Sequence, residues 1–263
     1  MTDREQLLAL YSACFPEDDP QFWDWVFDKL YRAENTLTLR EHGRIVASLQ
    51  MIPCEMQLGT ERFPAHYIYA AATLPEWQGK GLMARLLAQA EDEGRHRGQA
   101  FSVLITQEDS LLEYYARFGY EGRFEIAVMP PVEKALSDEH RCRRASTEDI
   151  PAFSNLYEQA CSEKLCGLRT EAFWKTQLEL FGSGVWALAH QGAVTAYAFA
   201  DERGIIEAVG PEASLLAAQV TPGKFWRTIS SEAGRPMGSI KPLAEEYRKI
   251  MEQNPCFLNL MYN

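Results

Sequence analysis

The sequence has few cysteines and histidines, and they do not occur in the patterns that usually bind metals. None of the six cysteines belongs to a C-x-x-C pair, and the five histidines do not fall at ligand spacing with them. Cys161 and Cys166 are the only close pair, and buried or idle thiols explain them best. We therefore expect no metal ion and no structural disulfide.

Basic side chains are also scarce, since 26 lysines and arginines stand against 37 aspartates and glutamates, for a net charge of −11. This balance disfavours a nucleic-acid partner. The N-terminus lacks the order of a signal peptide, and no apolar run approaches the length of a membrane span. We expect a cytoplasmic protein that binds neither nucleic acid nor membrane. An acidic surface would suit a cationic substrate such as an amine, but the ordinary acidity of a cytosolic protein explains the charge better.

The most informative stretch of the chain covers residues 67–87. Its pattern predicts a buried strand over 67–73, a turn stopped by Pro75, a glycine-rich loop over 78–81 and a helix from Leu82 toward Gly94. A helix that begins at such a loop has free N–H groups and the positive end of its dipole at its first turn. The stretch therefore predicts a pyrophosphate-binding site.

Two familiar phosphate loops fit this stretch poorly. A Walker A loop needs a hydroxyl residue after its lysine, but Lys80 is followed by Gly81. The dinucleotide fingerprint is formally matched by Gly79, Gly81 and Ala84, but five residues separate it from the preceding strand. A dinucleotide-binding oxidoreductase is therefore a weak alternative.

The loop instead resembles motif A of the GCN5-related N-acetyltransferases (GNAT), Gln/Arg-x-x-Gly-x-Gly/Ala, present as Gln78-Gly79-Lys80-Gly81-Leu82-Met83. Met83 departs from the small residue of the family. A second motif of the family, a short helix ending Tyr-x-x-x-Gly-Phe/Tyr, is matched by Tyr115, Gly119 and Tyr120. Glu108 lies where relatives often carry asparagine, which is a second departure.

The rest of the chain favours two copies of this fold. Short strands over 36–41 and 45–56, joined by a tight turn, predict antiparallel pairing ahead of the loop. The order of helices, hairpin strands and a further strand then recurs after Arg141, without the glycine loop. We predict an α/β protein with mixed sheets, built of a catalytic domain over 1–137 and a degenerate GNAT-like domain over 138–263. The arrangement resembles the Eis-like branch without its sterol-carrier-like domain.

The resemblance implies acetyl-CoA as cosubstrate and a small-molecule or protein amine as acceptor, with a homo-oligomer possible. It implies that Tyr115 protonates the departing sulfur. A non-catalytic acyl-CoA sensor is the alternative, because Met83 and Glu108 depart from the family pattern. The expected cofactor-binding residues are Ala71, Ala72, Thr73, Gln78, Gly79, Lys80, Gly81, Leu82, Met83, Ala84, Glu108, Ser110 and Leu111.

In Eis-like relatives the C-terminal carboxylate serves as the base, so the resemblance also implies that the carboxylate of Asn263 could do so here. If it does, adding residues after Asn263 is expected to lower kcat while leaving acetyl-CoA affinity intact. Both quantities can be measured on the extended and unextended proteins, and full activity in the extended protein would remove the hypothesis.

Overall fold

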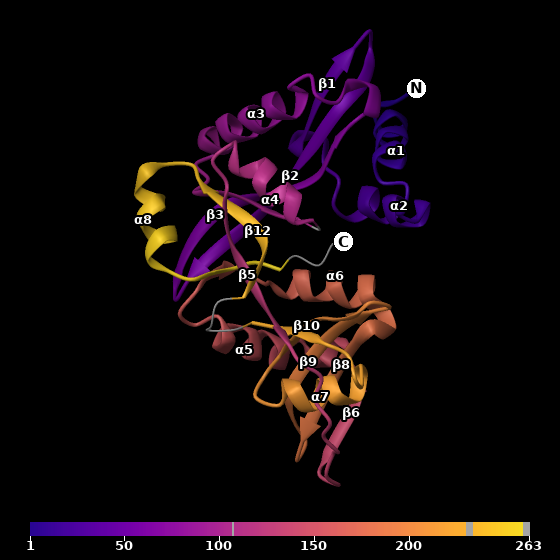
Figure 1. The fold of residues 1–263 in the computed structure, drawn as a ribbon, viewed down its shortest axis with the longest axis vertical. Helices are drawn as coiled ribbons and strands as arrows, with labels where there is room; N and C mark the ends of the chain where they lie inside the picture. The colour runs from indigo at the N-terminus through magenta and orange to yellow at the C-terminus, as the bar shows by residue number, and fades with distance from the viewer. Residues whose placement is uncertain (107, 230–233, 260–263) are drawn as a thin grey trace. The chain divides into compact units, whose positions relative to one another are not determined.

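The computed structural model describes residues 1–106, 108–229 and 234–259 (Figure 1). Its contacts divide the chain into two compact units. Unit 1 comprises Met1–Met56, Arg62–Glu121 and Ser239–Gln253, and unit 2 comprises Gln57–Glu61, Gly122–Gly238 and Asn254–Asn263. Within the described residues no helix has both the length and the apolar character that a membrane crossing requires.

Unit 1 is layered, with strands between two groups of helices. Figure 1 shows β1–β3 running between α3 and the α1–α2 pair. In chain order the elements of its first two segments are α1 Asp3–Cys14, α2 Pro20–Lys29, β1 Thr36–Glu41, β2 Arg44–Leu58, β3 Glu61–Thr73, α3 Leu82–His96, β4 Phe101–Ile105 and α4 Asp109–Ala116.

The strands of unit 1 pair in both directions, as expected for a mixed sheet. β1 and β2 are antiparallel from Thr36↔Gln50 to Glu41↔Arg44. The turn between them places His42 and Gly43 at φ 51° and 80°, which is the left-handed backbone that short hairpin turns need. β3 and β4 are parallel. The predicted antiparallel start and the mixed α/β class are therefore confirmed.

A late segment of the chain completes unit 1. β12 (Arg235–Pro242) leads into it, and α8 (Glu245–Gln253) follows. The backbone N–H of Leu243 donates to the Ala100 carbonyl at 2.8 Å, and Arg95 Nε donates to the Leu243 carbonyl at 3.1 Å. Lys241 forms an ion pair with Glu91. These residues fall within the second domain expected over 138–263. That division stays a prediction, whereas the contacts of residues 239–253 belong to unit 1.

Unit 2 repeats the element order of unit 1. The run α5, α6, β8, β9, β10, α7 matches the run α1, α2, β1, β2, β3, α3, and it confirms the predicted duplication. Its elements are β5 Glu121–Met129, β6 His140–Arg144, α5 Ile150–Ala160, β7 Leu165–Gly167, α6 Glu171–Phe181, β8 Val185–His190, β9 Ala193–Asp201, β10 Gly204–Val209, α7 Ala213–Val220, β11 Trp226–Thr228 and β13 Cys256–Phe257. The sequence did not predict α6, α7, β7, β11 or β12.

The core of unit 2 encloses an ion pair. Arg169 and Glu207 meet in two contacts of 2.5 and 2.8 Å, and the side chain of Glu207 is fully buried. Tyr197 donates to Glu207 at 2.9 Å and Asn259 does so at 3.0 Å. Arg169 also lies 4.0 Å from the centre of the Tyr157 ring. Each charge is neutralised and hydrogen-bonded, as a buried pair requires.

His66, in the core of unit 1, predicts how stability changes with pH. Its Nδ1 lies 2.6 Å from Gln99 Oε1, and burial lowers the pKa of His66 from 6.5 to about 4. Between these values the unfolded chain binds a proton that the folded chain does not. The free energy of unfolding is therefore expected to fall by roughly 3 kcal/mol between pH 6.5 and 4.

Urea unfolding at a series of pH values measures this dependence. His66→Gln is expected to reduce the change in the free energy of unfolding between pH 6.5 and 4, whatever the substitution does to stability at pH 8. The exposed His96 offers the matched control, and His96→Gln should leave the dependence as it is. An unchanged slope in His66→Gln would show that another group is responsible.

Candidate functional site

β3 is kinked where it approaches the glycine loop. Ala70 has a φ of 47°, which is rare for a residue with a side chain. The parallel register of β3 with β4 runs from Ala65↔Phe101 to Tyr67↔Val103 and stops before this kink. A bulge of this kind redirects a strand and ends its pairing. β2 neighbours β3 on one edge, and on the β4 edge the residues Ala71, Ala72 and Thr73 lie beyond this register, where an extended ligand could pair.

The loop after β3 is shaped by two left-handed glycines. Gly79 and Gly81 have φ values of 73° and 74°, and no atom lies within 4 Å of where a Cβ would be added to either. Glycine is therefore required by backbone conformation and not by lack of space. Gln78 Nε2 donates to the Thr73 carbonyl at 3.1 Å and fastens the loop to the strand end.

The first turn of α3 offers unpaired donors. Gly81 is its N-cap and provides no side-chain cap. The first bond to its carbonyl comes from the N–H of Arg85, at 3.2 Å, so the N–H groups of Leu82, Met83 and Ala84 precede the helical ladder. No acidic residue lies in this turn. The turn can therefore accept an anion.

A cation lies on the same loop. Lys80 is exposed, and its Nζ lies 4.2 Å from the centre of the Trp77 ring, where a cation–π contact holds it. On its other face α3 buries Leu86 and Leu87 completely, which fixes the helix against the unit. The predicted loop residues 78–84 thus form one continuous turn with free N–H groups and a cation, and their binding of an anion stays a prediction.

The strand end beside this turn has a hydroxyl without a partner. Among the described residues, Thr73 Oγ1 is buried and makes no hydrogen bond. Its carbonyl already accepts from Gln78, and also from Cys14 Sγ at 3.3 Å. An unpaired buried polar atom is costly, and a ligand with amide groups would satisfy it. The donors therefore fit a pyrophosphate that carries an extended amide-containing arm.

Tyr115 lies on α4, within a cluster of aromatic rings. Its ring is T-shaped to that of Tyr120, with centroids 5.9 Å apart. Burial, with a smaller contribution from Tyr114, raises the pKa of Tyr115 to about 12. Its hydroxyl makes no hydrogen bond to any residue that the structure describes. Tyr115 therefore holds a proton at neutral pH and has a hydroxyl that is available to a ligand.

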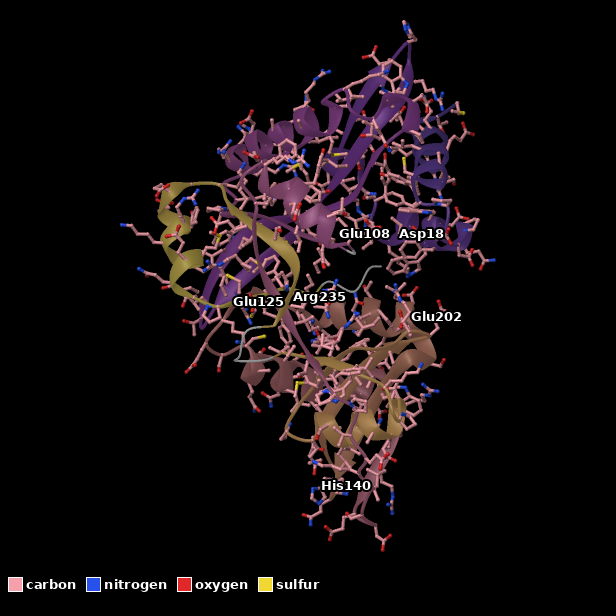
Figure 2. The ribbon with its side chains drawn as sticks, in the orientation of Figure 1. Asp18, Glu108, Glu125, His140, Glu202 and Arg235 are labelled. Atoms are coloured by element: carbon pink, nitrogen blue, oxygen red, sulfur yellow. The ribbon has the colours of Figure 1, made fainter. Side chains whose placement is uncertain are left out.

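The remaining predicted cofactor residues lie at the start of α4. Glu108, labelled in Figure 2, is the N-cap but makes no side-chain cap bond. Its carboxylate accepts from the Ser110 hydroxyl at 3.2 Å, and its carbonyl accepts from the N–H of Leu111 at 3.1 Å. Leu111 is 38% exposed. Contact of these three residues with a cofactor stays a prediction.

The structure narrows the choice of a general base. His66, a titratable residue of β3, is fully buried and paired with Gln99, so it cannot reach an amine. Asn263 lies outside the described residues. The kink at Ala70 was missed, because alanine carries no sequence signal for a left-handed backbone.

Comparison with known proteins supports the resemblance. Residues 1–122 match the family model described as an acetyltransferase (GNAT) domain. No curated protein sequence matches the chain.

Several solved structures share the fold at low identity. A probable N-acyltransferase from Enterococcus faecalis V583 aligns with a TM-score of 0.69 at 12% identity, over 92% of this chain and 70% of that one. Eis1 from Mycobacterium abscessus gives 0.61 at 12%, over 92% and 71%. A tandem GNAT protein from the clavulanic acid biosynthesis pathway gives 0.54 at 13%, over 92% and 95%. Residues 1–122 thus match the acetyltransferase (GNAT) family by its family model as well as by the motifs, and the solved structures show that the chain has the tandem form of the GNAT fold.

Proposed function

We propose that the protein transfers an acetyl group from acetyl-CoA to a primary amine, by direct attack within a ternary complex. The observation that carries this proposal is the open first turn of α3 directly behind the kinked end of β3. It supplies, within one short stretch, donors for a pyrophosphate and an unpaired strand edge for an amide-containing arm.

The residues of this stretch would divide the binding between them. The N–H groups of Leu82, Met83 and Ala84 would hold the pyrophosphate, with Lys80 adding positive charge. Ala71, Ala72 and Thr73 would pair with the pantetheine arm through their backbone groups, as a strand edge pairs with an extended segment. A backbone N–H at this edge would polarise the thioester carbonyl.

Bound acetyl-CoA would supply an activated acyl group, so the chain has to position the amine and supply a proton. Tyr115 would donate its proton to the departing sulfur. Burial raises the pKa of Tyr115, and the same surroundings would raise the pKa of a thiol that leaves within them. The closeness of these two pKa values would therefore set how efficiently the proton passes from Tyr115 to the sulfur.

The acceptor is proposed by chemical class only. The chain has 11 more acidic than basic side chains, which suits a cationic amine that sheds its proton on binding. Correct positioning of an amine against a thioester contributes strongly by itself, so a dedicated base is not essential. Binding of acetyl-CoA without turnover of any amine would instead support the sensor function.

Gly81→Ala tests the loop. The added Cβ meets no atom, but the left-handed φ costs about 1–2 kcal/mol in a residue other than glycine. We expect the loop to shift and the Kd for acetyl-CoA to rise roughly tenfold, as measured by calorimetry.

Gly98→Ala is the matched control, since Gly98 has a φ of 69° and equally open space at the other end of α3. It should lose similar stability but keep its acetyl-CoA affinity. Equal weakening in both variants would mean that the effect is one of general stability and not of the loop.

Tyr115→Phe tests the acid. The substitution keeps the ring and removes the proton, so kcat for thiol release from acetyl-CoA is expected to fall roughly 10²- to 10⁴-fold across a panel of amines. The Kd for acetyl-CoA should remain that of the unmodified protein. The adjacent Tyr114→Phe is the control and should retain activity. Undiminished kcat in Tyr115→Phe would assign Tyr115 to packing alone.

A further inference from the structure

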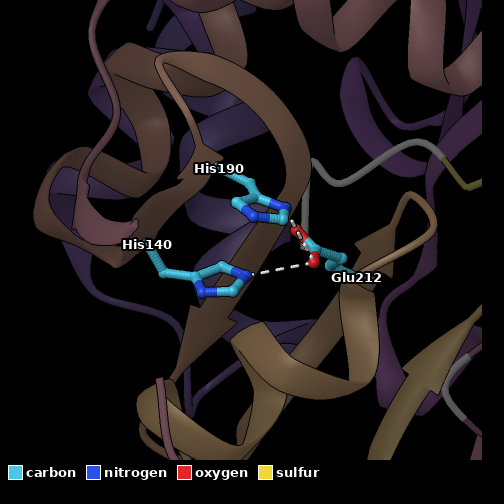
Figure 3. Close-up of side chains that lie close together, drawn as sticks. All are labelled: His140, His190 and Glu212. Atoms are coloured by element: carbon cyan, nitrogen blue, oxygen red, sulfur yellow. Dashed lines mark hydrogen bonds and ion pairs between the residues drawn. The ribbon is translucent and has the colours of Figure 1, made fainter. Parts of the chain in front are cut away.

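Two histidines and a glutamate converge in unit 2, far from one another in sequence (Figure 3). His140 begins β6 and His190 ends β8, and the two residues are directly opposite in the antiparallel register. Their rings stack with centroids 4.2 Å apart and an angle of 20° between their planes. Glu212, the N-cap of α7, lies beside both rings.

The three side chains direct their ligand atoms at one point. His140 Nε2 lies 3.1 Å from Glu212 Oε1, and His190 Nδ1 lies 3.4 Å from the same oxygen. All the ligand atoms lie within 4.8 Å of one another. Ligands at about 2.05 Å from a tetrahedral ion are about 3.3 Å apart, so both distances to the carboxylate already match such a site.

Groups behind the three side chains hold them in this orientation. Ser137 Oγ lies 2.6 Å from the other nitrogen of His140, and Glu139 Oε2 lies 3.4 Å from the other nitrogen of His190. The second oxygen of Glu212 accepts from Thr195 Oγ1 at 2.5 Å. Metal-bound histidines and carboxylates typically have outer partners of this kind.

We propose that His140, His190 and Glu212 bind a divalent transition-metal ion, with Zn²⁺ as the preferred occupant. Two imidazoles and a carboxylate suit zinc and exclude calcium and magnesium as good occupants, because those ions prefer oxygen ligands. The side chains of His190 and Glu212 are 35% and 26% exposed, which leaves the fourth position to water.

A bound ion would join three segments of unit 2 that are distant in the chain. It would fasten the start of β6 to the end of β8 and both to the start of α7. It would also lie at the strand-to-helix turn that corresponds, in element order, to the anion-binding turn before α3. The site is independent of the proposed acyl transfer, because no residue of the loop or of α4 belongs to it.

Metal binding can be tested on the full chain after treatment with a chelator. Zn²⁺ added alone is expected to bind at one equivalent and to raise the melting temperature. His190→Ala, His140→Ala and Glu212→Gln should each weaken binding roughly tenfold or more, and Thr195→Val should weaken it about tenfold through the outer partner. The exposed His96 is the control, and His96→Ala should bind as the unmodified protein does.

Co²⁺ as a second probe distinguishes these ligands from the six free cysteines. Tetrahedral visible bands without thiolate charge-transfer absorption are expected, and they should be lost in the His140→Ala/His190→Ala double variant. Absence of binding, thiolate absorption, or unchanged binding in that variant would each overturn the proposal. Circular dichroism without metal shows whether a variant is folded. If His140→Ala does not fold, the test uses His190→Ala alone, which removes the more exposed of the two histidines.

Discussion

The constraint on which the site in unit 1 depends is the unpaired backbone at the N-terminus of α3. A helix leaves its first N–H groups without acceptors, and most helices satisfy them with a side-chain cap. Here the N-cap is Gly81, which has no side chain, and its left-handed φ orients the turn. Beside it, the end of β3 after Ala70 lies beyond the register of that strand with β4. Both features leave hydrogen-bonding groups free for a ligand, at a cost in local stability.

The corresponding turn of unit 2 has a different residue at the N-cap of its helix. α7 follows β10 as α3 follows β3, but its N-cap is Glu212. A carboxylate at the positive end of a helix is favourable, and it repels a phosphate. The copy that lacks the glycine loop thus has a carboxylate at the N-cap of its helix, where the first copy has Gly81 without a side chain. The same carboxylate is the centre of the proposed metal site.

Much of the fold could be predicted from local patterns. β1 has the predicted bounds, and α3 begins at Leu82 as the glycine loop indicated. α7 was missed, because a short helix over alanine and leucine, such as residues 213–220, resembles a buried strand. β12 was missed as well, since nothing local indicates that residues 239–253 contribute to unit 1.

The sequence alone determined the glycine turn before α3, because its features lie in consecutive residues from Gln78 to Ala84, whose conformation is set by two glycines. Tertiary structure decided the rest. The kink at Ala70 arises in an ordinary alanine, and His66 is a buried core residue that pairs with Gln99, 33 positions along the chain. His140, His190 and Glu212 showed no ligand spacing in the chain, since strand register and the start of α7 bring them together. Spacing rules detect only ligands that share a local segment.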